Sequence, residues 1–255
     1  MNIYTIKPSQ SINYVWLFFG LFFLIATIGT LYVLVVLVPS DSNLPKSTYL
    51  AVLPFVAIAG FSFYKMKNQS QLASLHLTQE SVTNLKTKQT ILWKNLGDLY
   101  FFSSGNVIGL PNNLAYRTSE NEPFEKITAV EYSIKDLETF ENFHCQPRTL
   151  EVLNQLQNGK TVAFSYLPNN TLKQGFNLVE SQFLNFDSDE ILLNNKELIY
   201  KSKTYSLQDL SVIGLGNSGK YQLKTQQGIT ILEFDKLNFI SCEVFRNVVN
   251  NLVKK

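Results

Sequence analysis

Two apolar stretches near the N-terminus differ from the rest of the chain. Residues 14–38 include 23 consecutive uncharged residues, and residues 49–64 form a shorter apolar stretch. A bilayer core about 30 Å thick is crossed by about 20 helical residues. The first stretch is long enough to span, and the second returns after a polar connection, residues 39–48. The pattern predicts a transmembrane hairpin over residues 1–69.

The flanking residues refine this prediction. Aromatic side chains favour the membrane interface, so Tyr14, Trp16, Tyr49 and Tyr64 are the expected anchors. Pro54 is expected to kink the second helix. A cleaved signal peptide is the alternative interpretation, but the apolar run is too long and no small-x-small cleavage site follows it.

Lysine positions predict the orientation of the hairpin. Lys7 precedes the first stretch, and Lys65 and Lys67 follow the second, whereas Asp41 and Lys46 cancel in the connection. Positive residues favour the cytoplasmic side. We therefore predict an inner-membrane or cell-membrane protein with two spans and both termini in the cytoplasm.

Beyond residue 70, short alternating apolar segments separated by turns predict antiparallel strands. The same pattern returns near the C-terminus, and a shift of 114 positions superimposes the two sets of apolar residues: Ile91, Trp93, Leu96 and Leu99 fall on Tyr205, Leu207, Leu210 and Ile213. Such self-similarity predicts an internal repeat.

Each half is also expected to contain a hairpin and a closing helix. Asn158-Gly159 predicts a turn between strands 149–157 and 160–166, and Gln227-Gly228 one between strands 220–226 and 229–234. Apolar spacing predicts amphipathic helices around residues 172–183 and 245–253. We therefore expect two domains after the hairpin, 70–184 and 185–255, the first with an elaboration at 103–146 that includes a short helix, 133–143, capped by Ser133.

Residues 77–100 carry a family resemblance. Their pattern, L-T-x-E followed by two strands and by Trp93, Leu96 and Leu99 at h-x-W-x-x-h-x-x-h spacing, resembles bacterial pleckstrin-homology-like (PH-like) domains, which often follow a two-helix membrane hairpin. The resemblance implies a membrane hairpin plus a mainly β, α+β part with two tandem PH-like units, each of antiparallel strands closed by a C-terminal helix. It implies no shared enzymatic activity.

Charge and cysteine content limit the function classes. The first 73 residues carry four lysines and one aspartate, so the remaining 182 carry 18 basic and 19 acidic residues. A nearly neutral domain lacks the basic surface that nucleic-acid binding needs. The two cysteines, Cys145 and Cys242, suit a reducing compartment without a disulfide.

One segment matches two nucleotide-binding patterns. Residues 214–220, GLGNSGK, fit both G-x-G-x-x-G and G-x-x-x-x-G-K. Either mechanism needs a helix to follow, whose N-terminal amides hold the phosphate. An alternating strand pattern follows instead, so we interpret the segment as a hairpin loop.

No other constellation indicates catalysis, a metal or a cofactor. His144 and Cys145 are adjacent; in a strand they would point to opposite faces, and a buried pair or a loop pair is the favoured interpretation. Two histidines and two cysteines, widely separated, do not form a recognisable zinc site. The acidic residues at 120–125 and 187–190 are interpreted as solvated loops.

Three lysines are candidate contacts for lipid headgroups or a partner. Lys86, Lys88 and Lys94 flank the first predicted hairpin of a domain held at a membrane. The alternative, which we favour, is a scatter of solubilising charges.

The sequence therefore predicts a membrane-held binding or scaffold module without catalysis, with the bilayer and a protein or peptide as partners. The alternative is an enzyme or transport-system subunit with a ligand site between the two β units. Its mark would be a pocket of converging ionisable groups with perturbed pKa values.

Overall fold

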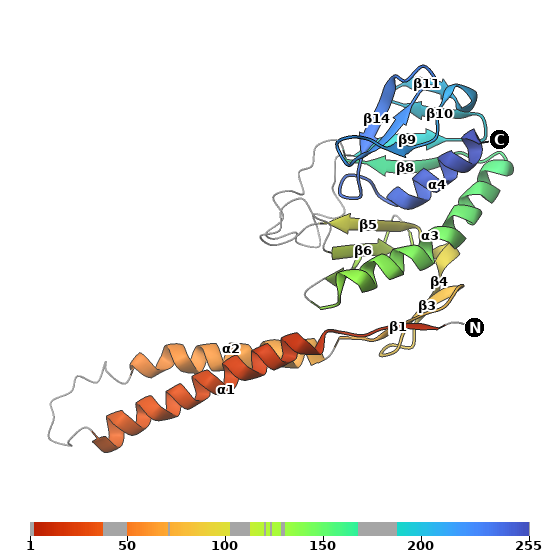
Figure 1. Ribbon diagram of the computed structural model, residues 1–255. Helices are drawn as coiled ribbons and strands as arrows, with labels where there is room; N and C mark the ends of the chain where they lie inside the picture. The colour runs from red at the N-terminus through yellow and green to blue at the C-terminus, as the bar shows by residue number, and fades with distance from the viewer. Residues whose placement is uncertain are drawn as a thin grey trace. The chain divides into compact units, whose positions relative to one another are not determined.

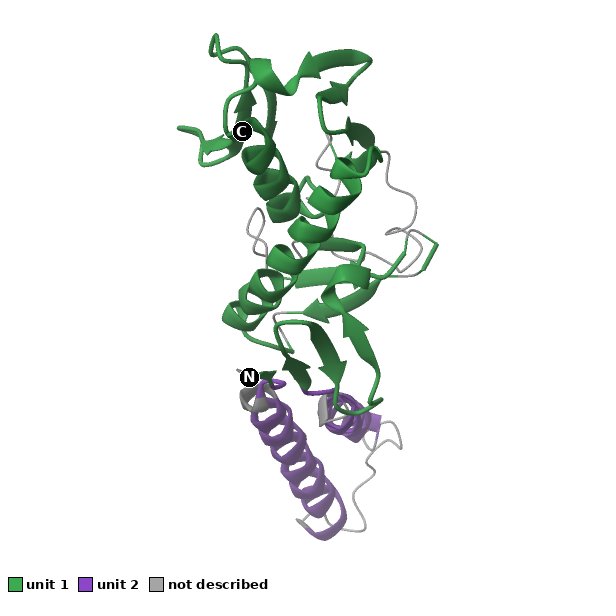
Figure 2. Ribbon diagram, turned by 90° about the vertical axis from the view of Figure 1, so that its right-hand side faces the viewer, with its two compact units in different colours: residues 1–6, 75–255 green, residues 7–74 purple. Residues whose placement is uncertain are grey.

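The computed structural model describes residues 3–37, 50–70, 72–102, 113–119, 121–122, 124–128, 131–167 and 188–254. The chain divides into two compact units (Figure 2). One contains residues 7–74, and the other joins residues 1–6 to residues 75–255. The described residues form four helices longer than two turns and four antiparallel sheets, an α+β structure.

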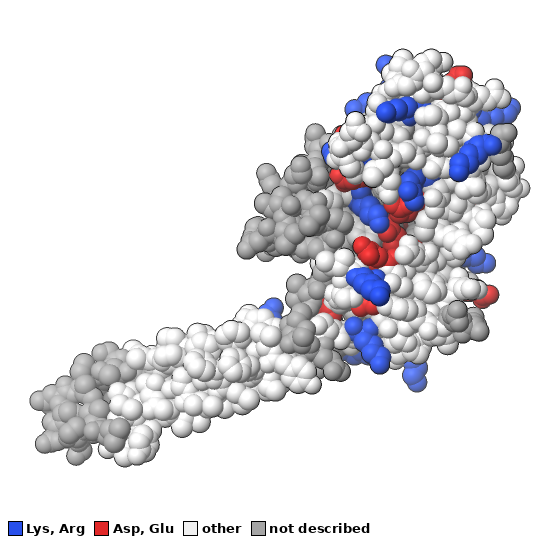
Figure 3. All heavy atoms as spheres, in the orientation of Figure 1, with Lys and Arg blue, Asp and Glu red and all other residues white. Residues whose placement is uncertain are grey.

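The smaller unit is the predicted helical hairpin. Its helices are α1 (Gln10–Tyr32), which continues into a π-helical turn (Val33–Leu37), and α2 (Leu53–Ser70). Windows at Asn13–Val36 and Leu50–Asn68 have mean hydropathies of 2.4 and 1.4 and are long enough to cross a membrane. Only 11% and 17% of these windows are buried, whereas the core helix of a soluble protein would be mostly buried. Figure 3 shows the visible face of this hairpin almost without charged residues.

Small side chains let the two helices approach each other. A Cβ added at Gly20 would lie 3.0 Å from the Phe63 ring, and Ala59 and Ser62 are buried. The rings of Phe23 and Phe55 stack with centroids 6.2 Å apart. Close packing through small residues is typical of membrane helix pairs.

The structure adds two details to the predicted hairpin, at Pro54 and at the interfacial aromatic residues. Pro54 is the second residue of α2, in the first turn, where proline interrupts no hydrogen bond. Pro54 thus lies at the start of α2 rather than in its interior, and a kink there stays a prediction. Tyr14 and Tyr64 are exposed and Trp16 contacts Phe61, while Tyr49 and the connection at 39–48 lie outside the described residues.

The larger unit contains one arrangement of elements twice (Figure 1). We call the first copy the first repeat. It has a four-stranded sheet, a three-stranded sheet and a helix: β1 (Tyr4–Ile6), β2 (Leu75–Leu77), β3 (Ser81–Asn84) and β4 (Thr90–Leu92); β5 (Asp98–Phe102), β6 (Asn113–Arg117) and β7 (Glu125–Thr128); and α3 (Ile134–Gln157).

The second repeat follows with the same order. Its four-stranded sheet has the order β11-β10-β9-β8, and its three-stranded sheet β12-β13-β14 precedes the last helix. The elements are β8 (Val162–Tyr166), β9 (Asp189–Leu193), β10 (Glu197–Tyr200) and β11 (Lys203–Ser206); β12 (Gly214–Leu215), β13 (Tyr221–Lys224) and β14 (Thr230–Phe234); and α4 (Cys242–Val253).

The predicted offset of 114 residues matches the structure. Trp93 begins a 3₁₀ turn after β4, and Leu207 begins one after β11. In both turns the residue three positions later, Leu96 or Leu210, donates its N–H back to the first residue of the turn. All four of these side chains are at most 5% exposed, so the shared apolar spacing reflects equivalent core positions.

One predicted hairpin is wrong. Residues 149–157 are the end of helix α3, and Asn158-Gly159 ends this helix. Gly159 has a φ of 77°, which suits the residue after a helix as well as a hairpin turn. The predicted helix at 133–143 is confirmed in its start, because Ser133 forms a capping box with Asp136, but α3 runs on to Gln157.

Because residues 149–157 are helical, strand β8 does not pair with them as predicted. It pairs along its whole length with β9, from Val162 opposite Leu193 to Tyr166 opposite Asp189. The first sheet of the second repeat thus begins at residue 162, before the predicted boundary at 184/185. The amphipathic helix predicted at 172–183 lies outside the described residues.

Helix α3 contributes to two hydrophobic cores. Leu137 and Phe140, near its start, belong to the core of the first repeat with Trp93. Val152 and Leu156, near its end, belong to the core of the second repeat. A helix that faces two cores has no single apolar stripe, which explains why its amphipathic pattern is weak.

The segment 235–241 connects the repeats between β5 and β8. Ser241 donates its N–H to the Leu99 oxygen at 2.7 Å, and its Oγ accepts from Leu99 N at 3.2 Å. Toward β8, Leu167 N donates to Asn238 O, and Ile240 N donates to Ser165 O. The segment thus hydrogen-bonds to both repeats.

Candidate functional site

The three predicted lysine contacts do not form one cluster on a single element. Lys86 and Lys88 lie in the exposed turn between β3 and β4, where Asn84 Oδ1 accepts from Lys86 N at 3.0 Å. Lys88 has a φ of 60°. Lys94 lies in the 3₁₀ turn after β4, beside a groove described below. Contact of these residues with headgroups or a partner stays a prediction.

The glycine-rich segment is a hairpin loop. Gly214 pairs with Gln222 across β12 and β13, and β13 follows directly at Tyr221. No helix begins after the segment, so the amide donors that a phosphate loop requires are missing there. The interpretation of residues 214–220 as a hairpin loop is confirmed.

His144 and Cys145 are buried, which is one of the two favoured interpretations, and they lie on helix α3 rather than in a loop or on a strand. His144 Nε2 donates to the Leu96 oxygen at 3.1 Å, and burial lowers the pKa of His144 to about 4, which leaves the ring neutral. Asn247 Nδ2 donates to Cys145 Sγ at 3.1 Å, and burial raises the pKa of the Cys145 thiol. Both residues therefore act in packing.

No group of three metal-ligating side chains occurs in the part of the chain that the structure describes. Both cysteines are free and buried.

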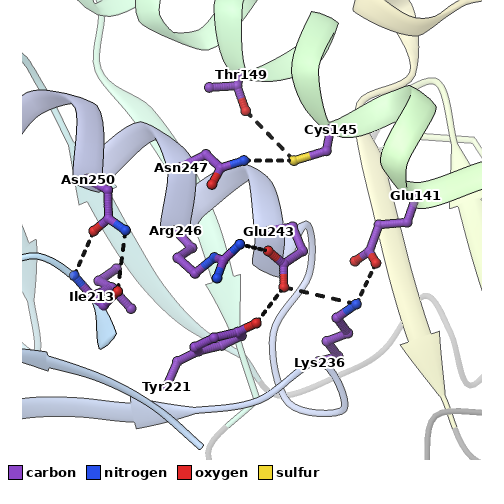
Figure 4. A network of polar contacts seen from close by, with 10 residues as sticks. All are labelled: Glu141, Cys145, Thr149, Ile213, Tyr221, Lys236, Glu243, Arg246, Asn247 and Asn250. Carbon is purple, nitrogen blue, oxygen red and sulfur yellow. Dashed lines mark hydrogen bonds and ion pairs between the residues drawn. The ribbon is translucent and has the colours of Figure 1, made fainter. Parts of the chain in front are cut away.

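A network of charged groups lies where α3, α4 and the segment 235–241 meet (Figure 4). Lys236 Nζ lies 2.5 Å from a Glu141 carboxylate oxygen and 4.0 Å from one of Glu243. Arg246 lies 2.6 Å from the other oxygen of Glu243, and the Tyr221 hydroxyl donates to Glu243 at 2.8 Å. Two carboxylates and two cations thus balance each other.

Aromatic rings lie against the two cations of this network. Lys236 Nζ lies 5.1 Å from the centre of the Phe101 ring, and the Arg246 guanidinium lies 4.9 Å from that of Tyr221. Both distances suit cation–π attraction. Glu141 comes from the first repeat and Glu243 from the second, so Lys236 links the two repeats electrostatically.

Burial perturbs the titration of the network. Burial raises the pKa of Glu141 to about 7, although the charge and hydrogen bond of Lys236 oppose the shift. The pKa of Lys236 is raised by Glu141, against the effect of its own burial. Perturbed groups of this kind occur at functional sites and in structural ion-pair networks.

A cavity of about 430 Å³ adjoins the network, and we call it the junction cavity. Lys236 and Tyr221 reach both the network and this cavity. The remaining wall is formed by Leu215, Ser218, Gly219, Lys220, Asp235 and Leu237.

A larger groove follows one face of α3, and we call it the α3 groove. It comprises two adjoining cavities of about 560 Å³ and 240 Å³, which share Gln79, Glu80 and Pro147. Together they fall within the size range of ligand-binding pockets. The other lining residues are Leu92, Lys94, Asn142, Phe143, Gln146 and Leu150.

The chemistry of the α3 groove is apolar with amide groups. Leu150 is 61% exposed and Leu92 39%, so two large apolar side chains face solvent here. Pro147 lies inside helix α3 and has no N–H, so the Phe143 carbonyl lacks its helical donor. The amides of Gln79, Asn142 and Gln146 can both donate and accept. This combination suits the backbone and apolar side chains of a peptide.

Neither surface was predicted residue by residue. The network joins positions 141, 221, 236, 243 and 246, and the groove joins positions 79–80, 92–94 and 142–150, so no local spacing indicates either. Pro147 lay between the predicted helix 133–143 and the predicted strand 149–157, so its place inside α3 was not expected. Comparisons with known protein families, with curated proteins and with solved structures find no match for this chain.

Proposed function

We propose that this chain is an integral membrane protein with two spans, whose larger unit is a cytoplasmic, non-enzymatic binding module. The α3 groove is the observation that carries the proposed role. It offers exposed apolar side chains, amide groups and a helix carbonyl without a helical donor. Proteins of this kind hold a partner at the membrane rather than transform a substrate.

Strand pairing supports two spans rather than a signal peptide. β1 precedes α1 and β2 follows α2, yet the two strands pair, from Tyr4 opposite Leu77 to Ile6 opposite Leu75. Adjacent strands must lie on one side of a membrane, so the hairpin between them crosses an even number of times. Cleavage after α1 would also remove Ile6, which is fully buried in the first core.

The repeated architecture supports a PH-like fold for both repeats. Each has antiparallel strands followed by a C-terminal helix, as the resemblance of residues 77–100 implies, with the strands divided into a sheet of four and a sheet of three. The lysine distribution supports a cytoplasmic position for this unit, which joins residues before the hairpin to residues after it.

The charge network supports a role without catalysis. Each of its four charged groups has an opposite charge within 4.0 Å, and Tyr221 donates to Glu243. Groups that neutralise each other in this way stabilise a junction, whereas a catalytic acid or base must face its substrate.

Cysteine labelling in intact cells tests the topology. Cys145 and Cys242 are buried, so single cysteines introduced by Ser42→Cys, in the connection, and Lys254→Cys, near the C-terminus, report separately. We expect a membrane-impermeant maleimide to label Ser42→Cys in intact cells and Lys254→Cys only after permeabilisation. The reverse pattern would place the binding unit outside, and labelling at both sites would exclude two spans.

A pair of surface variants tests the groove. Leu150→Glu places a charge in the α3 groove, and Ile229→Glu places one on a residue of similar exposure, 66%, in the second repeat. The full chain, extracted from native membranes, should retain a stoichiometric partner in its wild-type and Ile229→Glu forms and lose it in Leu150→Glu. Equal retention by both variants would contradict a binding role for the groove.

The junction cavity supports a second candidate function, a small-ligand site formed by the second repeat and the segment 235–241. Lys236 and Tyr221 face both this cavity and the network with the raised Glu141 pKa. Native mass spectrometry of the full chain would test it. A bound small molecule that is lost in Lys220→Gln, which changes the cavity without touching the network, would favour this function over partner binding.

A further inference from the structure

We infer that the α3 groove binds an acidic, apolar segment from the membrane-proximal part of another membrane protein. This inference rests on the proposed binding function and adds the chemistry and the location of the partner. Chain length, local charge and the groove surface support it independently.

Chain length restricts how far the groove can lie from a membrane. Gln79, in the groove wall, is nine residues after Ser70, the last residue of α2. Nine residues span at most about 32 Å even when fully extended. If α2 crosses the bilayer, Gln79 stays within this reach of the end of α2, whatever the arrangement of the two units. The juxtamembrane segments of a partner membrane protein lie within the same distance of the bilayer.

Local charge favours an acidic segment. Residues 81–97 contain Lys86, Lys88 and Lys94 and neither aspartate nor glutamate. Lys94 lines the groove, and no ion pair joins it to a carboxylate among the described residues. Arg148 donates to the Lys94 carbonyl at 3.3 Å and so holds the backbone of Lys94 against α3. Glu80 is the opposing charge in the wall.

The groove surface favours a protein segment over lipid headgroups. Leu150 and Phe143 supply apolar contacts, which suit apolar side chains better than a charged headgroup, and Pro147 removes the N–H that would otherwise bond the Phe143 carbonyl in the helix. A peptide supplies apolar side chains and backbone N–H groups together. The amides of Asn142 and Gln146 can satisfy its carbonyl groups.

Site-specific photo-crosslinking of the full chain in native membranes tests the inference. A benzophenone amino acid replaces Leu150 in the groove, or Ile229 as the matched control of similar exposure. We expect one cross-linked protein from position 150 and none of it from position 229. Mass spectrometry should place the cross-linked residue within about 20 residues of a membrane span of that protein, since about 32 Å corresponds to that many helical residues.

Charge variants test the recognition itself. With the probe at position 150, Lys94→Glu should lower the cross-linking yield several-fold, whereas Lys94→Arg should preserve it. Equal yields in both variants would contradict an acidic segment.

The following outcomes of the cross-linking experiment would contradict the inference. Cross-links to a second copy of this chain, or to lipid alone, would overturn the inference. Cross-links to a partner far from its membrane span would overturn it while leaving the binding function of the groove intact. No cross-link, combined with partner retention by Leu150→Glu, would reject both proposals.

Discussion

The two repeats share an order of strands and a helix but differ in what interrupts and completes them. The first is interrupted after β1 by the helical hairpin, and its helix α3 has 24 residues. The second has no such insertion among its described residues, and its helix α4 has 12. The first repeat thus carries both the hairpin and a helix that packs into two cores.

This difference separates two tasks. α4 uses one continuous apolar face, with Val244, Phe245, Val248 and Val249 all buried in the second core. α3 divides its buried side chains between two cores and leaves an exposed face, interrupted by Pro147, that forms the groove. The repeated architecture thus contains one helix, α4, that covers a single core, and one helix, α3, that joins two cores and lines the groove.

The largest expected effects test whether α3 serves both cores. Phe140→Ala and Leu156→Ala each empty a fully buried position, at costs of about 3–5 and about 2–5 kcal/mol respectively. Hydrogen exchange of the full chain should show lost protection in β2 and β3 for Phe140→Ala, and in β9 and β10 for Leu156→Ala. Loss in the same strands for both variants would show that α3 does not divide its contacts.

The contribution of the buried Glu141 carboxyl to the stability of the fold should depend on pH. The pKa of Glu141 is about 7 in the folded protein and has its ordinary value of 4.5 in the unfolded protein. Protonated Glu141 therefore stabilises the folded state below pH 4.5, and this contribution to the free energy of unfolding is lost as the pH rises through 7. A shift of this size corresponds to about 3 kcal/mol. Thermal unfolding at pH 5 and pH 8 should show a smaller difference for Glu141→Gln than for wild type.

The control for this variant is Glu138→Gln, on an exposed position of the same helix. The Glu138 charge is the smallest of the influences on the pKa of Glu141, so this variant should retain most of the pH dependence of the wild type. If Glu141→Gln and Glu138→Gln behave alike, Glu141 does not titrate near neutral pH.

A smaller effect tests the connection between β5 and α4. Ser241→Ala removes the acceptor of the buried Leu99 N–H and should cost about 1–3 kcal/mol. Ser211→Ala, which removes a hydroxyl bonded to Lys224 O within the second repeat, is the matched control and should cost less because Ser211 is only partly buried. Chemical denaturation of both variants measures the difference, and equal costs would contradict a connecting role for Ser241.

The smallest effect tests the insertion that distinguishes the first repeat. Gly20→Ala places a methyl group 3.0 Å from the Phe63 ring and should cost about 1 kcal/mol, since this ring can shift. Gly29→Ala meets no atom within 4 Å and should be neutral. Thermal unfolding in lipid nanodiscs compares the two, and equal stability would argue against close packing at Gly20.

Sequence patterns predicted the elements whose signals are local. The hairpin helices, the strands around Trp93 and Leu207, the hairpin at Gln227-Gly228 and helix α4 all follow from apolar spacing and turn residues. Helix α3 was only partly predicted, because its two buried faces obscure the helical period and Gly159 ends a helix as readily as it forms a turn.

Other features depend on contacts between distant residues. β1 is three residues long and pairs with β2, about 70 positions away, so no neighbouring turn indicates it. The ion pair of Glu141 with Lys236 joins residues 95 positions apart. Such contacts arise from tertiary packing, on which the spacing of residues within one element has no bearing.

The pairing of β1 with β2 has a consequence for biogenesis. During synthesis β1 leaves the ribosome first, and its partner follows only after both hairpin helices. If these helices span, a chain that inserts only one of them leaves β1 and β2 on opposite sides of the bilayer, with Ile6 missing from the first core. Folding of the first repeat then requires correct insertion, and a misinserted chain exposes an unfinished sheet to the proteases that remove defective membrane proteins.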